Sequence, residues 1–222
     1  MELIKPMLML KYKTTLLTMF MAFSHVAMGS DLGQTLATQG NSKGATACIA
    51  CHGVDGAGMA AASFPRLAGI NPAYMEKQLH DFAKATRNSA IMAPIASALS
   101  DEEIKAVAAY YSKLKLITPS AQAATDDTLM EVGKKLAEKG NWPNDIPACF
   151  TCHGAGANGI GDPFPALAGQ HASYIEQQLQ YWRSGQRNND PNELMKGVAV
   201  RLSDAEIKAV SAYLASLTLT AN

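Results

Sequence analysis

The sequence predicts an all-α protein made of two consecutive copies of one helical domain. Blocks of residues recur at an offset of about one hundred positions, which indicates an internal duplication. Each copy contains three segments in which apolar residues follow the spacing of an amphipathic helix. No segment alternates apolar and polar residues for long enough to predict a strand.

The repeat sets the expected domain boundaries. Residues 64–69 match residues 164–169, and residues 99–107 match residues 202–210. The stretch between the copies is mostly small and polar, which is typical of a linker. We therefore expect a leader at 1–29, a first domain at 30–117, a linker at 118–126 and a second domain at 127–222.

The leader has the order of a secretory signal peptide. A basic start is followed by an apolar run at 16–23 and by the small residues Ala27 and Gly29, which predict cleavage before Ser30. The alternative is an uncleaved membrane anchor, but the apolar run is well short of the ~20 residues that span a bilayer. We expect export to the periplasm and removal of residues 1–29.

The charge balance excludes one class of partner. The chain has 19 basic and 19 acidic side chains, and removal of Glu2 and three lysines with the leader leaves 16 and 18, a formal charge of −2. A near-neutral protein lacks the basic surface that binds nucleic acid.

The helical segments recur in the same order in both copies. In the second copy, Leu129, Val132 and Leu136 fall on one face of a first helix at 128–139. Second helices are predicted at 72–86 and 172–184.

The third helix of each copy begins with a capping box. Ser100 precedes Glu103 by three residues, and Ser203 precedes Glu206 by the same interval. Apolar residues with helical spacing follow each box.

Each copy also carries the attachment signature of c-type haem, Cys-x-x-Cys-His. Two thiols at this spacing form thioether bonds with the two haem vinyl groups, and the histidine becomes the proximal iron ligand. A redox dithiol or a zinc site are the alternatives for an isolated Cys-x-x-Cys. All four cysteines lie in the two motifs and each motif continues with histidine, so we expect two covalent haems at Cys48, Cys51 and His52 and at Cys149, Cys152 and His153.

The second axial ligand of each iron is predicted from the repeat. Met92 lies seven residues before Leu99, and Met195 lies seven before Leu202, so both hold the same place in the repeat, in loops between the second and third helices. A methionine is otherwise a common filler of apolar cores. The duplicated position favours ligation by Met92 and Met195 over the other candidates, which are Met59, Met75, Met130, His80 and His171.

Two further pairs are weaker candidates. The carbonyl groups of Pro65 and Pro165 could accept the free N–H of the proximal histidine, or these prolines could only form turns. Arg87 and Arg187 could meet haem propionates, or they could be solvated residues at helix ends.

These motifs together resemble the dihaem class I cytochromes of the cytochrome c4 type, over nearly all of the chain after the leader. The resemblance rests on both Cys-x-x-Cys-His motifs, each followed by Phe-Pro-x-Leu-Ala-Gly, by Gln-Leu and by a methionine before Leu-Ser-Asp-x-Glu-Ile. It implies two cytochrome c domains related by a pseudo-twofold axis, with the haem edges facing each other. It also implies a periplasmic carrier, in some members held loosely at the membrane, between a quinol-oxidising complex and a terminal oxidase.

The expected function is therefore electron transport in a respiratory chain, not catalysis. If histidine and methionine fill both axial positions of each iron, no position is open to a substrate. One alternative is the haem subunit of a flavocytochrome c dehydrogenase such as sulfide dehydrogenase, whose catalysis resides in a separate flavoprotein. A dihaem peroxidase is a further alternative, but it needs one open iron, and the matched methionines argue against it.

Overall fold

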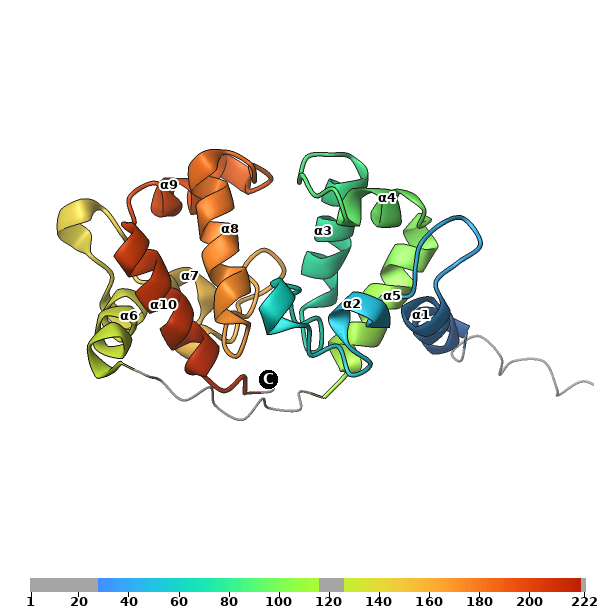
Figure 1. The fold of residues 1–222 in the computed structure, drawn as a ribbon, viewed down its shortest axis with the longest axis horizontal. Helices are drawn as coiled ribbons and strands as arrows, with labels where there is room; N and C mark the ends of the chain where they lie inside the picture. The colour runs from blue at the N-terminus through green and yellow to red at the C-terminus, as the bar shows by residue number, and fades with distance from the viewer. Residues whose placement is uncertain (1–27, 116–125, 221–222) are drawn as a thin grey trace, which may run out of the picture.

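The computed structural model describes residues 28–115 and 126–220, which form two helical halves that lie side by side (Figure 1). Within these residues there are helices and isolated bridges but no strand, so the prediction of an all-α fold is confirmed. The long helices of the first half are α1 (Met28–Gln39), α3 (Pro72–Ala83) and α5 (Asp101–Lys113), and those of the second are α6 (Asp127–Lys139), α8 (Ala172–Ser184) and α10 (Asp204–Ser216). In Figure 1, α3 and α8 face each other across the middle, and α1 and α6 lie at the outer ends.

Short helical turns complete each half. The α-helical turns are α2 (Ile49–His52), α4 (Met92–Ser97), α7 (Cys149–His153) and α9 (Leu194–Ala199). The 3₁₀ turns are η1 (Ala60–Ala62), η2 (Trp142–Asn144), η3 (Ala155–Ala157) and η4 (Pro191–Glu193).

The first and last long helices of each half pack through a glycine. A Cβ atom at Gly133 of α6 would lie 2.2 Å from the carbonyl oxygen of Ala209 in α10, and one at Gly33 of α1 would lie 2.3 Å from that of Ala106 in α5. The helices can therefore approach this closely only because neither residue has a side chain. The close approach also corrects one expectation: the buried face of α6 centres on Gly133 and Leu136, and Val132 is 40 % exposed.

The remaining predicted helices agree with the structure except at one end. Helix α8 spans the predicted residues 172–184, and α5 and α10 begin with the predicted capping boxes. Helix α3 ends at Ala83, three residues before the predicted end, because Ala85 has a left-handed φ of 56° and the Arg87 N–H donates to the Asp81 carbonyl instead.

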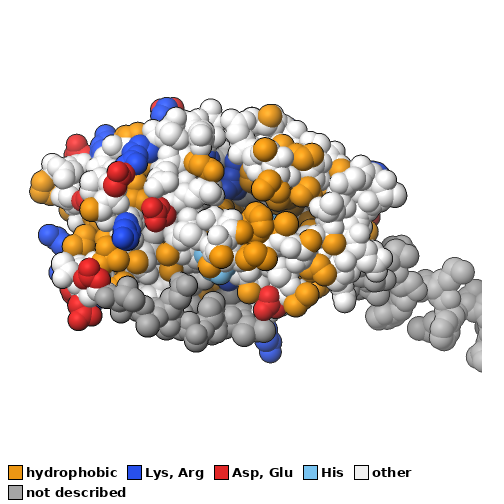
Figure 2. All heavy atoms as spheres, viewed as in Figure 1, with side chains coloured by type: hydrophobic (Ala, Val, Ile, Leu, Met, Phe, Trp, Pro, Cys, Tyr) orange, Lys and Arg blue, Asp and Glu red, His pale blue; other side chains and the backbone are white. Residues whose placement is uncertain are grey.

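The two halves differ in the side chains that they expose on one face of the molecule. In Figure 2 apolar side chains gather over the first half, whereas charged side chains are more frequent over the second. Most of the predicted leader and linker, at 1–27 and 118–125, lies outside the described residues. None of the helices in the described part of the chain is long and apolar enough to cross a bilayer.

Candidate haem-binding site

One cavity of about 800 Å³ is shared by the two halves. Its apolar wall comes from α3 and α5 on one side and from α8 and α10 on the other, and includes Leu79, Phe82, Val107, Leu179, Trp182 and Val210. Seven of the eight predicted site residues line it: Cys48, Cys51, His52, Met92, Cys149, His153 and Met195. The eighth, Cys152, is exposed beside it in the short helix α7.

A short helix brings each cysteine motif to the cavity. In the first half, Cys48 caps α2 and Cys51 follows three residues later, so both thiols fall on one face of the turn. The turn ends at Gly53, whose φ of 78° is in the region that glycine adopts without strain. The second motif forms α7 in the same way. Burial raises the pKa of the Cys48 thiol, and raises that of Cys149 to about 11, so both are neutral thiols in the unmodified chain.

Each histidine of the motifs is oriented by a proline carbonyl. His52 Nδ1 lies 2.9 Å from the Pro65 oxygen, and His153 Nδ1 lies 2.8 Å from the Pro165 oxygen. Because a carbonyl oxygen can only accept, Nδ1 must carry the proton, and Nε2 keeps a free lone pair. Burial lowers the pKa of both imidazoles, which keeps them neutral. The role expected of the two prolines as acceptors is confirmed.

One of these histidines lacks a partner that an iron ion would supply. Nε2 of His153 is buried and has no hydrogen-bond partner in the structure. A buried nitrogen with an unused lone pair is costly unless something binds it, and neutral imidazole is a common iron ligand.

Only three of the candidates for the second axial ligand line the cavity. Met75, Met92 and Met195 line it, whereas Met59, Met130, His80 and His171 do not. Met75 is packed in the core of the first half, 6 % exposed, and its counterpart in the repeat is Ile175, which cannot bind iron.

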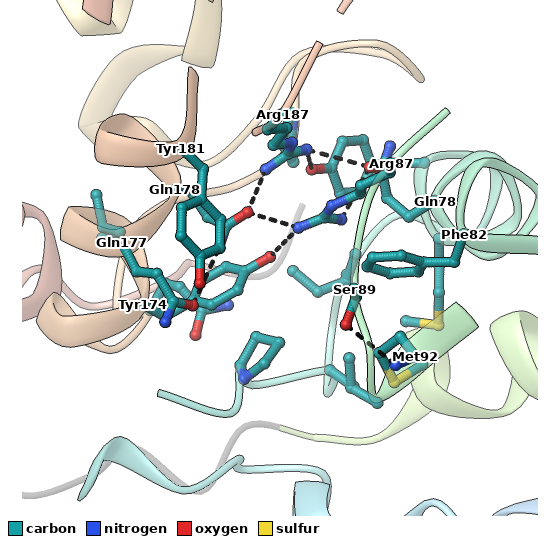
Figure 3. A pocket seen from close by; sticks show the side chains of 18 of the residues that line it. Gln78, Phe82, Arg87, Ser89, Met92, Tyr174, Gln177, Gln178, Tyr181 and Arg187 are labelled. Carbon is teal, nitrogen blue, oxygen red and sulfur yellow. Dashed lines mark hydrogen bonds between the residues drawn. The ribbon is translucent and has the colours of Figure 1, made fainter. Parts of the chain in front are cut away.

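The two matched methionines lie in short helices rather than in the loops that the sequence led us to expect. Met92 is the first residue of α4, and Met195 is the second residue of α9. A side chain holds each backbone: Ser89 Oγ accepts the Met92 N–H at 3.0 Å, and Asp190 Oδ2 accepts the Met195 N–H at 2.8 Å. Figure 3 shows Met92 beneath the Phe82 ring with its Ser89 hydrogen bond.

A reciprocal polar cluster in the lining of the cavity joins the two halves at α3 and α8 (Figure 3). Arg87 donates to Tyr174 Oη at 2.9 Å and to Gln178 Oε1 at 2.7 Å. Arg187 donates to Tyr74 Oη and to Gln78 Oε1, each at 3.1 Å. The two halves exchange the same contacts, as a twofold relation between them requires.

The sequence did not reveal this cluster. Tyr74, Gln78 and their copies are visible in the repeat, but polar residues at matched helical positions carry no mark of an interface. One signal could have pointed to them. Both copies have a glutamine, Gln78 or Gln178, directly before a leucine of the apolar helix face, where an apolar residue would be expected if the position only packed in a core.

The two arginines of the cluster are buried positive charges. Arg87 and Arg187 are 6 % and 4 % exposed, and within the described residues neither forms a salt bridge. Their side chains also lie over the Phe82 and Trp182 rings, at 4.5 and 4.0 Å from the ring centroids. Two buried cations next to a cavity favour an anionic ligand there. The solvated positions that we weighed for these arginines are therefore wrong.

Together these residues fit one c-type haem in each half. The apolar walls suit a porphyrin, and the two cysteines of each motif have the sequence spacing of haem attachment. The histidine Nε2 atoms keep a lone pair for iron, and the buried arginines would suit the propionates.

Comparison with known proteins agrees with this fit. Residues 30–115 and 130–218 each match the cytochrome c family. The chain is 48 % identical to a thiosulfate dehydrogenase electron acceptor of Stutzerimonas stutzeri over 186 residues, which is 83 % of this chain and 86 % of that protein.

Two solved structures are similar as well. The crystal structure of reduced cytochrome c4 from Pseudomonas stutzeri matches with a TM-score of 0.74 and 35 % identity, over 85 % of this chain and 98 % of that one. The thiosulfate dehydrogenase TsdBA of Marichromatium purpuratum matches with a TM-score of 0.79 and 43 % identity, over 85 % of this chain but only 40 % of that longer one.

Two cytochrome c domains, each with its Cys-x-x-Cys-His motif, carry two covalently bound haem c groups. The proteins that resemble most of this chain include an electron acceptor and a cytochrome c4, and the chain is likewise a dihaem electron carrier. The chain belongs to the cytochrome c family and is a dihaem class I cytochrome of the cytochrome c4 type.

Proposed function

We propose that this cytochrome accepts electrons from a thiosulfate dehydrogenase and carries them through the periplasm toward a terminal oxidase. The proposal is supported by the identity of 48 % to a thiosulfate dehydrogenase electron acceptor and by the similarity to part of a thiosulfate dehydrogenase chain. The leader at 1–29 would direct export, and peripheral contact with the membrane is compatible with this role.

The observation that carries the electron-transfer part of the proposal is that all four candidate iron ligands line the shared cavity. In this proposal His52 and Met92 bind the first iron, and His153 and Met195 bind the second. A haem held in this way supplies a one-electron Fe(III)/Fe(II) couple. The soft methionine sulfur favours Fe(II) and so raises the reduction potential relative to two nitrogen ligands.

The same proposed arrangement favours electron transport over catalysis. Protein side chains at both axial positions leave no site where a substrate reaches the iron. A dehydrogenase withdraws electrons from its substrate and needs an acceptor, and two one-electron sites in one chain can receive a pair of electrons singly. The chain would therefore act beside the enzyme and not as one.

The donor can be tested with the oxidised holoprotein. A trace of purified thiosulfate dehydrogenase with thiosulfate should reduce both haems, as followed by their visible absorbance, and thiosulfate without the enzyme should not. A quinol-oxidising complex with quinol, the donor expected from the sequence, is the competing arm. Rapid reduction by that complex together with none by the dehydrogenase would contradict the proposed donor.

A further inference from the structure

Arg66 is a buried cation at the boundary between the two halves. It is 2 % exposed and lines the shared cavity. Its Nη1 donates to the Ala68 carbonyl in its own half, and its Nη2 donates to the Ala168 carbonyl of the other half at 3.0 Å. Ala68 and Ala168 are matching positions of the repeat, so the guanidinium lies between two equivalent loops.

Those loops are the ones that orient the histidines of the haem motifs. Pro65, which accepts from His52, comes three residues before Ala68, and Pro165, which accepts from His153, comes three before Ala168. The Arg66 guanidinium is therefore hydrogen-bonded to both of the loops whose proline carbonyls orient the histidines.

Gln170 of the second half fixes the backbone of Arg66. Its Oε1 accepts the Arg66 N–H at 2.9 Å, and its Nε2 donates to the Arg66 carbonyl at 3.1 Å. The repeat does not duplicate this pair, because the matching residues are Ala166 and Ile70. One positive charge thus lies at the boundary without a symmetry-related copy.

The charge is not neutralised by its surroundings. Among the described residues no carboxylate forms a salt bridge with Arg66, and both of its Nη groups donate to neutral carbonyls. Burial lowers the pKa of Arg66 to about 10, which leaves it a cation at neutral pH. Arg87 and Arg187 also lack a salt bridge among the described residues, but they would contact the anionic propionates if the haems bind as proposed.

We propose that Arg66 acts as a fixed positive charge that raises the reduction potentials of both haems. Reduction adds one electron to each iron, so a nearby cation in a poorly solvated region stabilises the reduced state. Because the guanidinium is held between equivalent loops, both potentials respond in the same direction. The inference rests on the dihaem carrier function and its proposed iron ligands, but not on the identity of the donor.

The test is a spectroelectrochemical titration of the purified holoprotein, resolved into its two components. Arg66→Ala copies the residue that the second half has at this position, and should shift both components to lower potential. Arg66→Lys keeps the charge and should restore most of the loss. Arg201→Ala removes an exposed arginine of the second half and should shift neither component.

Several results would overturn the inference. Potentials in Arg66→Ala equal to those in Arg201→Ala would show that the charge has no effect. A shift of only one component would indicate a local change in the loop of the first half. Equal shifts in Arg66→Ala and Arg66→Lys would assign the effect to lost hydrogen bonds.

Two controls keep the test decisive. If Arg66→Ala does not fold, Arg66→Met, which keeps most of the side-chain length, replaces it in the same comparison. The methionine–iron absorption band is recorded for every variant. A wild-type protein without that band would contradict the ligand assignment, whereas intact bands with unshifted potentials would contradict only the role of Arg66.

Discussion

At the scale of single residues, closure of both irons depends on two methionines that occupy the same place in the repeat. Met92 and Met195 line the cavity, and Met75 lines it too. Position in the repeat is what distinguishes them, because Met75 has Ile175 as its counterpart.

Replacement of Met92 by alanine should remove the methionine–iron band from one haem and leave the other band intact. Met195→Ala should do the same to the other haem, since each thioether serves one iron. Met75→Leu is the matched control, and it should keep both bands because the volume of a core residue is nearly conserved. The oxidised absorption spectrum, calibrated per haem, measures all three. Loss of both bands in Met92→Ala would refute independent ligation.

At the scale of elements, the long helices were predictable because they span enough turns for the helical spacing of apolar residues to be recognised in the sequence. Helix α8 and the capping boxes of α5 and α10 follow from the sequence alone. The six-residue helices α4 and α9 do not, because they span fewer than two turns. The buried face of α6 was misjudged at Val132, because a glycine contact leaves no hydrophobic signal.

The contact between α6 and α10 should not tolerate a methyl group. Gly133→Ala would place a Cβ atom 2.2 Å from the Ala209 carbonyl oxygen, so the helices must separate. Overpacking of this kind costs about 1–3 kcal/mol in the free energy of unfolding. Gly197→Ala in α9 is the control: its nearest neighbour would be the end of the Arg201 side chain at 3.6 Å. Urea unfolding of both variants compares them, and an equal cost would contradict the close packing.

The capping box of α10 should make stability depend on pH. The Ser203 N–H donates to Glu206, which lowers the pKa of that carboxyl below its usual value, with a further contribution from Asn141. Because the pKa of Glu206 is lower in the folded state than in the unfolded state, its ionisation stabilises the fold at pH values above the usual pKa of about 4.3. This stabilisation is lost as the pH falls through the lowered pKa of the folded state. Glu206→Gln, which cannot titrate, should therefore flatten the acid limb of stability against pH. An unchanged acid limb would contradict this assignment.

At the scale of the whole molecule, the duplication, the helical class and the haem content could be read from the sequence, but the contact between the halves could not. Which face of α3 meets α8 depends on how two folded units dock. Arg66 and Gln170 illustrate the limit, because their hydrogen bonds cross 104 positions of the chain.

The reciprocal cluster should couple the two halves energetically. Tyr74→Phe removes an acceptor of Arg187, and Tyr174→Phe removes one of Arg87. Hydrogen bonds from charged donors contribute about 1.5–3 kcal/mol each, and the double variant should depart from additivity by at least ~0.5 kcal/mol. Tyr213→Phe, whose hydroxyl meets Glu138 on the exposed surface, is the control with a small effect. Additive costs in a denaturant-unfolding cycle would mean that the cluster does not act as a unit.

Ligation of both irons by histidine and methionine can be detected in the absorption spectrum of the purified, oxidised holoprotein. We expect two equivalents of the methionine–iron band per chain, unchanged when peroxide is added, and no binding of carbon monoxide after both haems are reduced. One equivalent or none, together with binding of these ligands at an open iron, would contradict the claim and point to a catalytic haem.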